Sequence, residues 1–327
     1  KLLIIGGGGY VGSVVSKYLS QFNELEITII DKFIYIDQDK KIFHNSKKVK
    51  IINIHFEDFD FDSYHYNIVI FFAGLVGDPI TKKYPELSNL INENSILNFI
   101  SKISNFKFDK FIFISTCSNY GLMADSMIAD EESTLNPLSL YAKSKVKIEK
   151  KIIDNDFKNF SSVILRFSTA FGLSDRMRFD LTVNQFTYEA LYKKKLIIYD
   201  PDTWRPYCHV SDFARAIKKV IESPRKLINN QIFNVGLDEN NSTKRMLVEK
   251  IKANQVKFLS TFNEKGNDPR NYRVSFKKIN QLLNFYPKIN IDFGIKEILD
   301  WLKLEEKNNL HLKGNFKIEE NFINYYL

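Results

Sequence analysis

Short apolar runs alternate with longer amphipathic stretches through the first half of this chain. The apolar runs have the length of strands, and most of the stretches between them have the periodicity of helices. The predicted strands are residues 2–5, 25–30, 49–54, 67–72, 110–115 and 161–166. Two of these runs, 68–72 and 111–114, are apolar at every position, as expected for strands that are buried on both faces. The alternation therefore predicts an α/β fold with a doubly wound parallel sheet.

Beyond about residue 170 the alternation becomes less regular, and loops that contain proline and asparagine join the predicted elements. The helix-like stretches and one strand-like run of this half are residues 182–193, 210–222, 243–252 and 231–235. We therefore predict a first domain of residues 1–170. Residues 171–327 would form a smaller lobe that is interleaved with the last strands and helices of the sheet.

Composition places the chain among ordinary globular proteins. Hydrophobic residues make up 44% of the 327 residues and charged residues 26%, which is enough to bury a sizeable core. The only cysteines are Cys117 and Cys208, a number that fits a reducing cytoplasm, and they form no metal-binding spacing with the five histidines. No apolar run has the length of a membrane span and no leader pattern precedes the first strand. We therefore expect a cytoplasmic protein with no bound metal and no membrane partner.

The formal charge of +8 raises the question of nucleic-acid binding. The lysines are scattered, often in runs typical of an exposed surface such as residues 193–195, and no basic stripe is interleaved with aromatic residues. This pattern argues against nucleic acid as a partner. It leaves two interpretations open, a solvated surface and the attraction of a small anionic substrate.

A run of four glycines, residues 6–9, follows the first predicted strand and is followed in turn by Tyr10, Val11 and Gly12. Glycine permits positive φ angles and a close approach of the backbone, and amide groups at a helix N-terminus attract phosphate. A strand, a tight turn and a helix in this order predict a site for a dinucleotide pyrophosphate. Two spacings fit the motif: Gly7, Gly9 and Gly12, or Gly6, Gly9 and Gly12.

An acidic residue, Asp31, ends the second predicted strand about 20 residues after the glycines. A carboxylate at this position accepts hydrogen bonds from ribose hydroxyls and repels a 2′-phosphate, so Asp31 favours NAD over NADP. The cation of Lys32, directly after it, weakens this preference because it could pair with a phosphate.

Hydroxyl groups and a Tyr-x-x-x-Lys pair supply candidate chemistry. Ser115 and Thr116 end the fifth predicted strand, and Tyr141 and Lys145 follow about 25 residues later. The i, i+4 spacing places tyrosine and lysine on one helix face. There an ammonium favours the phenolate, which makes Tyr141 a usable general base. Thr116 could polarise the same substrate oxygen, so the residues suit removal of a proton from an alcohol while a hydride leaves its carbon.

These motifs, in this order, resemble those of the extended short-chain dehydrogenase/reductase family, in the group of NAD-dependent epimerases and dehydratases that modify nucleotide sugars. The resemblance covers nearly the whole chain. It implies a Rossmann domain that binds NAD in residues 1–170, a substrate-binding lobe in residues 171–327, and the glycine spacing Gly6, Gly9 and Gly12. It also implies a homodimer, although no helical seam for one is evident in the sequence.

The resemblance assigns roles to individual residues. It implies that Thr116 is the catalytic hydroxyl, Tyr141 the base and Lys145 its partner. The residues implied to contact the cofactor are Gly6, Gly9, Tyr10, Val11, Gly12, Asp31, Lys32, Asn53, Ile54, Phe72, Ala73, Gly74, Ser115, Tyr141, Lys145, Phe167 and Ser168. Those implied to contact the substrate are Val76, Thr116, Thr169, Asn184, Arg205 and Arg270, and the two guanidinium groups suit the oxygens of a diphosphate.

The chain departs from the family pattern in two places. Asn53 stands where the family usually has an aspartate that contacts adenine. Cys117 and Ser118 occupy the two positions where nucleotide-sugar 4,6-dehydratases carry an Asp-Glu pair. The chain therefore lacks the acid and base for elimination of water.

The resemblance implies oxidation at C4 of a nucleotide-diphosphate sugar to a 4-keto sugar nucleotide. Segment 173–180, with Asn184 after it, resembles enzymes that act on precursors of bacterial surface polysaccharides, in particular GDP-manno-heptose C4-oxidising enzymes of capsule synthesis. A C4 epimerase that retains its NADH would share every residue named above. A non-catalytic NAD-binding scaffold is a third interpretation, against which the intact Thr116, Tyr141 and Lys145 speak.

Overall fold

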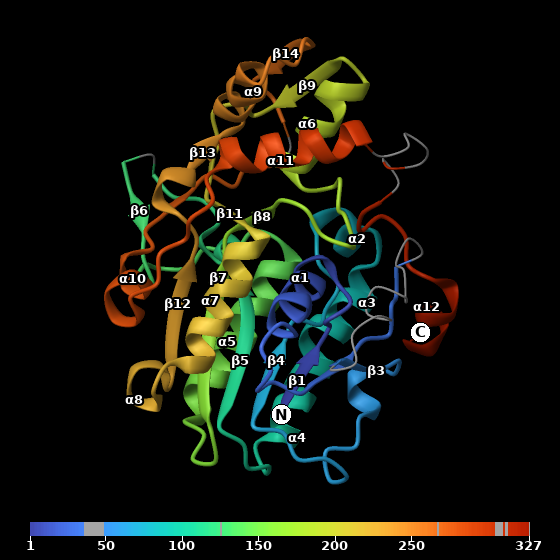
Figure 1. The fold of residues 1–327 in the computed structure, drawn as a ribbon, viewed down its shortest axis with the longest axis vertical. Helices are drawn as coiled ribbons and strands as arrows, with labels where there is room; N and C mark the ends of the chain where they lie inside the picture. Colours follow the sequence, from blue (N-terminus) through green and yellow to red (C-terminus); the bar gives the residue numbers. More distant parts are fainter. Residues whose placement is uncertain (36–48, 125, 267, 305–309, 311–312, 327) are drawn as a thin grey trace.

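The computed structural model describes residues 1–35, 49–124, 126–266, 268–304, 310 and 313–326. Figure 1 shows a central sheet with helices on both faces and a smaller lobe beyond one end of its strands. Within the described ranges, no helix combines the length and the apolar character that crossing a membrane requires.

The central sheet has seven strands, all parallel, in the order β12-β7-β5-β4-β1-β2-β3. Their bounds are β1 (Leu2–Ile5), β2 (Ile27–Ile30), β3 (Val49–Ile52), β4 (Ile68–Phe71), β5 (Lys110–Thr116), β7 (Ser161–Phe167) and β12 (Gln231–Val235). Strand β1 pairs with β2 on one side and β4 on the other, so the direction of winding reverses between β1 and β4. This confirms the predicted doubly wound α/β fold, and the predicted strands lie within a few residues of the observed ones.

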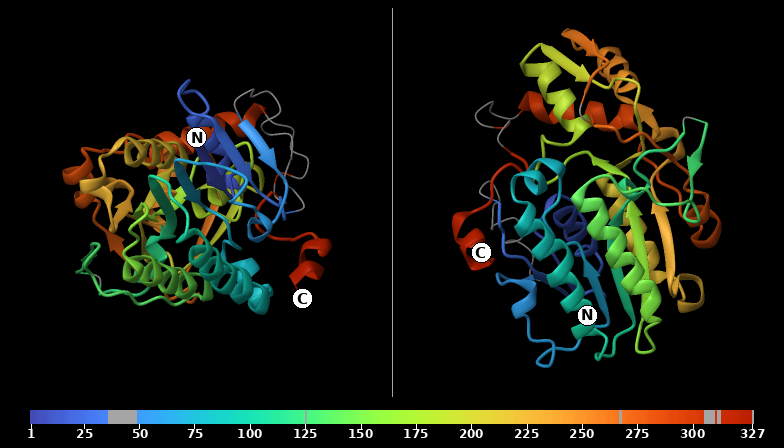
Figure 2. Two further views of the ribbon diagram at one scale, coloured as in Figure 1. Left: turned by 90° about the horizontal axis from the view of Figure 1, so that it is seen from below. Right: turned by 180° about the vertical axis from the view of Figure 1, so that it is seen from behind.

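Helices cover the two faces of the sheet because successive strand residues point to opposite sides. Leu2 and Ile4 belong to the core beneath α1 (Tyr10–Leu19) and α7 (Val210–Glu222). Leu3 and Ile5 belong to the core beneath α4 (Ile96–Ile103) and α5 (Leu140–Asn155), which Figure 2 shows from behind. Burial on both faces explains why the strands are apolar at nearly every position.

Short elements connect these layers. Their bounds are η1 (Phe56–Asp58), α2 (Asp78–Lys83), α3 (Pro85–Asn89), η2 (Leu90–Ser95), η3 (Cys117–Tyr120), β6 (Ile128–Ala129), α8 (Arg225–Ile228), η4 (Asp238–Asn240), β15 (Arg273–Val274), α10 (Lys277–Leu283) and α12 (Glu320–Tyr326).

The smaller lobe has a core of its own, formed mainly by three helices. Its elements are α6 (Thr182–Tyr192), β9 (Lys195–Tyr199), α9 (Lys244–Ala253), β14 (Leu259–Asn263) and α11 (Ile291–Leu304). The short strands β8 (Thr169–Phe171) and β11 (Tyr207–His209) pair with each other and lie between the lobe and the sheet, and β10 (Trp204–Arg205) pairs with β13 (Ser242–Thr243). Strand β12 comes from the second half of the sequence but pairs with β7 in the main sheet. The two parts are thus interleaved along the chain, and the division at residue 170 stays a prediction.

The glycine turn between β1 and α1 is closely packed. Gly6 has a φ of +82°, a conformation that glycine adopts without strain. A Cβ on Gly12 would lie 2.4 Å from the carbonyl oxygen of Gly6 and 2.8 Å from the Cα of Gly7, whereas a Cβ on Gly9 would lie 3.5 Å from its nearest neighbour. Gly12 therefore permits α1 to begin directly against the turn.

We predict that Gly12→Ala destabilises the protein by about 1–3 kcal/mol, because the added methyl group overpacks rigid backbone. Gly9→Ala is the matched control, since its φ of −74° suits alanine and its Cβ has room. Chemical unfolding of both variants measures the difference. Equal stabilities of the two variants would show that the turn tolerates a side chain at residue 12.

Candidate active site

A cavity of about 410 Å³ lies outside the carboxyl ends of the central strands, where ligands bind in doubly wound sheets. Most residues predicted from the sequence line it. From the predicted cofactor set these are Gly6, Gly9, Tyr10, Val11, Gly12, Asp31, Lys32, Ile54, Phe72, Ala73, Gly74, Ser115, Tyr141, Lys145, Phe167 and Ser168, and from the predicted substrate set Val76, Thr116, Thr169, Arg205 and Arg270.

Two predicted contacts do not line the cavity. Asn53 is exposed outside it, while its neighbour Ile54 lies in the wall. Asn184 is fully buried in α6, and its amide is used within the protein: it accepts a hydrogen bond from the Gly172 amide at 3.1 Å and donates to Tyr10 and to the Arg178 carbonyl at 3.0 Å. In this structure the Asn184 amide fixes the loop before α6, and its role as a substrate contact stays a prediction.

Asp31 lies at the carboxyl end of β2 and holds the glycine turn in place. One carboxylate oxygen accepts the amide of Gly8 and the other the amide of Phe33, both at 2.7 Å. The first-turn amides of α1 have no acceptors within the helix. The turn, the helix end and the carboxylate thus stand side by side at the cavity wall, as required for a pyrophosphate and its ribose.

The three predicted catalytic side chains come from two neighbouring elements. Thr116 ends β5, and its hydroxyl oxygen accepts the Ser118 amide at 3.1 Å. Tyr141 and Lys145 lie one turn apart on α5, and the ammonium nitrogen lies 5.7 Å from the centre of the tyrosine ring. All three line the cavity.

Lys145 carries its charge in a buried place. Its side chain is only 2% exposed, its nitrogen donates to the Ile114 carbonyl at 2.8 Å, and it lies 4.4 Å from the centre of the Phe113 ring. Burial lowers the pKa of Lys145 to about 7, and the nearby carboxylate of Glu149 opposes this shift. The lysine is therefore able to gain and lose a proton near neutral pH.

A buried polar network lies directly beneath the catalytic side chains. Glu149, one turn beyond Lys145 on α5, forms an ion pair with Arg166 of β7 at 2.7 Å, and both side chains are less than 5% exposed. The same carboxylate accepts hydrogen bonds from Ser115 and, at 2.8 Å, from Asn119. The network ties the catalytic helix to the two strands that end at the cavity.

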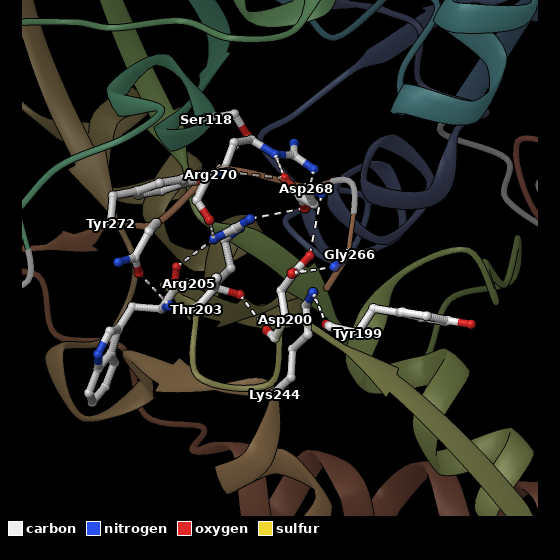
Figure 3. A network of polar contacts seen from close by, with 12 residues as sticks. Ser118, Tyr199, Asp200, Thr203, Arg205, Lys244, Gly266, Asp268, Arg270 and Tyr272 are labelled. Atoms are coloured by element: carbon white, nitrogen blue, oxygen red, sulfur yellow. Dashed lines mark hydrogen bonds and ion pairs between the residues drawn. The ribbon is translucent and has the colours of Figure 1, made fainter. Parts of the chain in front are cut away.

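At the other end of the cavity, Asp268 holds two arginines together (Figure 3). One of its oxygens accepts from Arg205 at 3.0 Å and from Arg270 at 2.8 Å, and the other accepts from Arg270 at 2.7 Å. Burial opposes the negative charge, but the two guanidinium groups outweigh it and hold the pKa of Asp268 below its usual range. The pair of arginines forms a cationic wall that suits a diphosphate.

The carboxylates among the described lining residues are already engaged. Asp31 accepts two backbone amides, Asp180 pairs with Arg178, and Asp268 pairs with both arginines of the wall. In the described ranges, no group of three or more His, Cys, Asp or Glu side chains could hold a metal ion.

The thiol of Cys117 is buried and donates to the Arg166 carbonyl at 3.2 Å, and burial raises its pKa. Ser118, which does line the cavity, accepts a hydrogen bond from Tyr272 at 3.3 Å. Neither position supplies a general acid or base, in agreement with the departure seen in the sequence.

Sequence reasoning missed several lining residues. Arg176 and Arg178 lie in segment 173–180, whose resemblance to enzymes of surface-polysaccharide synthesis assigned no role to either arginine. The others come from places with no motif: Tyr35, His55, Lys244, Tyr272, Asn315, Phe322 and Tyr326. Three of these follow residue 312, and only the folded chain shows that they reach the cavity.

Comparison with known proteins gives the family. The model of the NAD dependent epimerase/dehydratase family matches residues 2–236. A putative UDP-glucose 4-epimerase of Methanocaldococcus jannaschii is 23% identical over an alignment of 313 residues, which covers 92% of this chain and 98% of that protein.

Two solved structures are similar in fold. The UDP-glucuronic acid 4-epimerase of Bacillus cereus, in complex with UDP-glucuronic acid and NAD, has a TM-score of 0.79 and 20% identity, and the UDP-glucose 4-epimerase of Thermotoga maritima, with UDP-glucose, has a TM-score of 0.81 and 21% identity. In both cases 92% of this chain and 98% of the other are covered. At this identity the likeness shows the fold. Because the family model matches more than half of the residues, the chain belongs to the NAD dependent epimerase/dehydratase family.

Proposed function

We propose that this protein uses NAD to oxidise C4 of a nucleotide-diphosphate sugar, and that Thr116, Tyr141 and Lys145 carry out the proton transfer. The observation that carries the proposal is that these three side chains line the same cavity as the glycine turn and the pair of arginines. One continuous site therefore offers a dinucleotide cradle, a base and a diphosphate wall.

The residues present fit NAD. The glycine turn lies so close to the end of β4 that a Cβ on Gly6 would lie 2.6 Å from the Ala73 amide nitrogen. Only glycine fits at residue 6, and the cavity wall there is formed by backbone. Gly6, Gly9 and Gly12 with the first turn of α1 would hold the pyrophosphate, and Asp31 the adenosine ribose. When bound, NAD supplies a hydride acceptor.

The catalytic side chains would share the proton chemistry. Tyr141 removes the proton of the C4 hydroxyl, and the Lys145 ammonium stabilises the phenolate that this requires. The oxygen of Thr116 accepts the Ser118 amide, which leaves its O–H available to donate to the same substrate oxygen. Burial of Lys145 strengthens the electrostatic effect because little water screens its charge.

Supporting observations favour an epimerase over the other outcomes of C4 oxidation. Elimination of water needs an acid and a base, and the described carboxylates of the cavity are engaged by amides or arginines. The relatives and structures reported above carry names of 4-epimerases that act on UDP-sugars. A net 4-dehydrogenase uses the same residues and is the second candidate. GDP-manno-heptose as the substrate, capsule synthesis as the setting and the homodimer remain predictions from the sequence.

Product analysis with Tyr141→Phe tests the proposed activity. We expect the wild-type protein, incubated with a panel of UDP- and GDP-sugars, to give a sugar nucleotide of unchanged mass with C4 inverted, as seen by NMR. Tyr141→Phe should lower turnover by about 10²- to 10⁴-fold, because it removes the base but keeps the ring. A loss of two hydrogens from the product would favour the 4-dehydrogenase instead. Unchanged turnover in Tyr141→Phe would contradict the mechanism.

The diphosphate wall predicts a separate effect on substrate binding. Arg205→Ala should raise the KM for the sugar nucleotide by about 10- to 100-fold, because a hydrogen bond to a charged group contributes about 1.5–3 kcal/mol. The affinity for NAD should not change. Arg245→Ala is the matched control, since Arg245 pairs with Asp202 on the exposed surface of the same lobe. An equal KM for the two variants would show that Arg205 does not bind the substrate.

The lowered pKa of Lys145 predicts a stability effect with a definite sign. The pKa of Lys145 is about 7 in the folded protein and about 10.5 in the unfolded chain. Between these two pH values the unfolded chain holds a proton that the folded protein has lost. The wild type should therefore gain stability relative to Lys145→Met as the pH rises through this window, by about 1.4 kcal/mol per pH unit. Chemical unfolding of both proteins at several pH values measures the difference. A difference in the free energy of unfolding that does not change with pH would show that the buried lysine keeps an ordinary pKa.

A further inference from the structure

Residues 313–326, here called the arm, lie outside the part of the chain that the family model matches. The arm contains α12 and crosses to the edge of the sheet near β3 (Figure 1). Three of its side chains, Asn315, Phe322 and Tyr326, line the cavity.

Asn315 joins the arm to two loops that line the cavity. The side chain is 3% exposed, and its amide nitrogen donates to the Val76 carbonyl at 2.6 Å, while its oxygen accepts from Arg176 at 2.6 Å. Arg176 also donates to the carbonyl of Gly314 at 3.2 Å. The start of the arm is therefore fixed by buried hydrogen bonds, and the two from the charged Arg176 are of a kind that is among the stronger ones in proteins.

The helix of the arm packs on the segments that follow β2 and β3. Ile318 forms a bridge with Tyr35, and Phe322 is buried in a cluster with Tyr35 and Leu75. The ring of His55 stacks on Tyr325, with the ring centres 3.8 Å apart.

Tyr326 is fixed as well, since its hydroxyl donates to Glu57 at 2.5 Å. Its ring and that of Phe322 line the same cavity as Asp31, Lys32, Ile54 and His55, and both rings pack against the ring of His55. This is the end of the cavity that the turn and Asp31 assign to the adenosine.

We propose that the arm forms the outer wall of the adenosine end of the NAD site and retains the dinucleotide between turnovers. An epimerase returns the hydride to the carbon from which it came, so its reduced cofactor must stay bound. A net dehydrogenase must exchange its cofactor after each turnover. The inference about the wall rests on family membership, and its link to epimerisation rests on the proposed function.

The experiment measures the release of labelled NAD into excess unlabelled NAD, with no sugar present. Phe322→Ala/Tyr326→Ala removes both rings from the wall, and we expect it to release NAD at least about tenfold faster than the wild type, which corresponds to about 1.4 kcal/mol of lost contact. Phe316→Ala is the matched control, because Phe316 belongs to the same arm but is 38% exposed and does not line the cavity. It should release NAD at the wild-type rate.

Equal release rates for the double variant and the wild type would overturn the proposal. Should the double variant not fold, Tyr326→Ala alone, in the last turn of α12, gives the same comparison. Sustained turnover of the double variant should require added NAD, whereas that of the wild type should not. NAD release is measured without sugar, so fast release from the variant supports the role of the arm whether or not a sugar is converted. A failure to convert any sugar would reject the proposed function alone.

Discussion

The buried ion pair between Glu149 and Arg166 is the interaction on which the candidate site depends. Taking two charges out of water costs several kcal/mol each, and the cost is offset only when the geometry is good and further hydrogen bonds satisfy both groups. Here Ser115 and Asn119 donate hydrogen bonds to the Glu149 carboxylate, and the Tyr120 hydroxyl accepts one from the Arg166 guanidinium at 3.0 Å. The result is a helix held in one register against β5 and β7. That register places Tyr141 and Lys145 in the same cavity as Thr116. It also keeps a carboxylate near the buried ammonium, which would otherwise lose its proton more readily.

Much of the fold and the centre of the site could be predicted from the sequence because both depend on local patterns. Continuous apolar runs indicated strands buried on two faces, and the carboxyl ends of such strands had to lie together. The glycine turn, Asp31 and the Tyr141–Lys145 spacing carry their chemistry in a few neighbouring residues. The burial of a single polar residue such as Asn184 could not be predicted, and its amide forms hydrogen bonds with Gly172, Tyr10 and Arg178 inside the protein.

The outer wall of the cavity could not be predicted, since that wall depends on contacts between distant segments. His55 and Tyr326 are 271 positions apart by their numbers and carry no motif, yet their rings lie 5.4 Å apart in the structure. Asp268 was visible only as a neighbour of Arg270, and its position between two guanidinium groups required the fold. Family membership and the shared site thus give the type of reaction, while such contacts determine how firmly cofactor and substrate are held.

The central claim is that the hydride comes from C4 of the sugar. The most direct measurement uses UDP- and GDP-sugars that carry deuterium at C4, added to the protein loaded with unlabelled NAD. The reaction is stopped within the first turnover, while the keto sugar and the reduced cofactor are still present, and the reduced cofactor is analysed by mass spectrometry. The account predicts that deuterium appears in the reduced cofactor for the sugar that is turned over. Reduced cofactor without deuterium would show that the hydride leaves another carbon and would contradict the account.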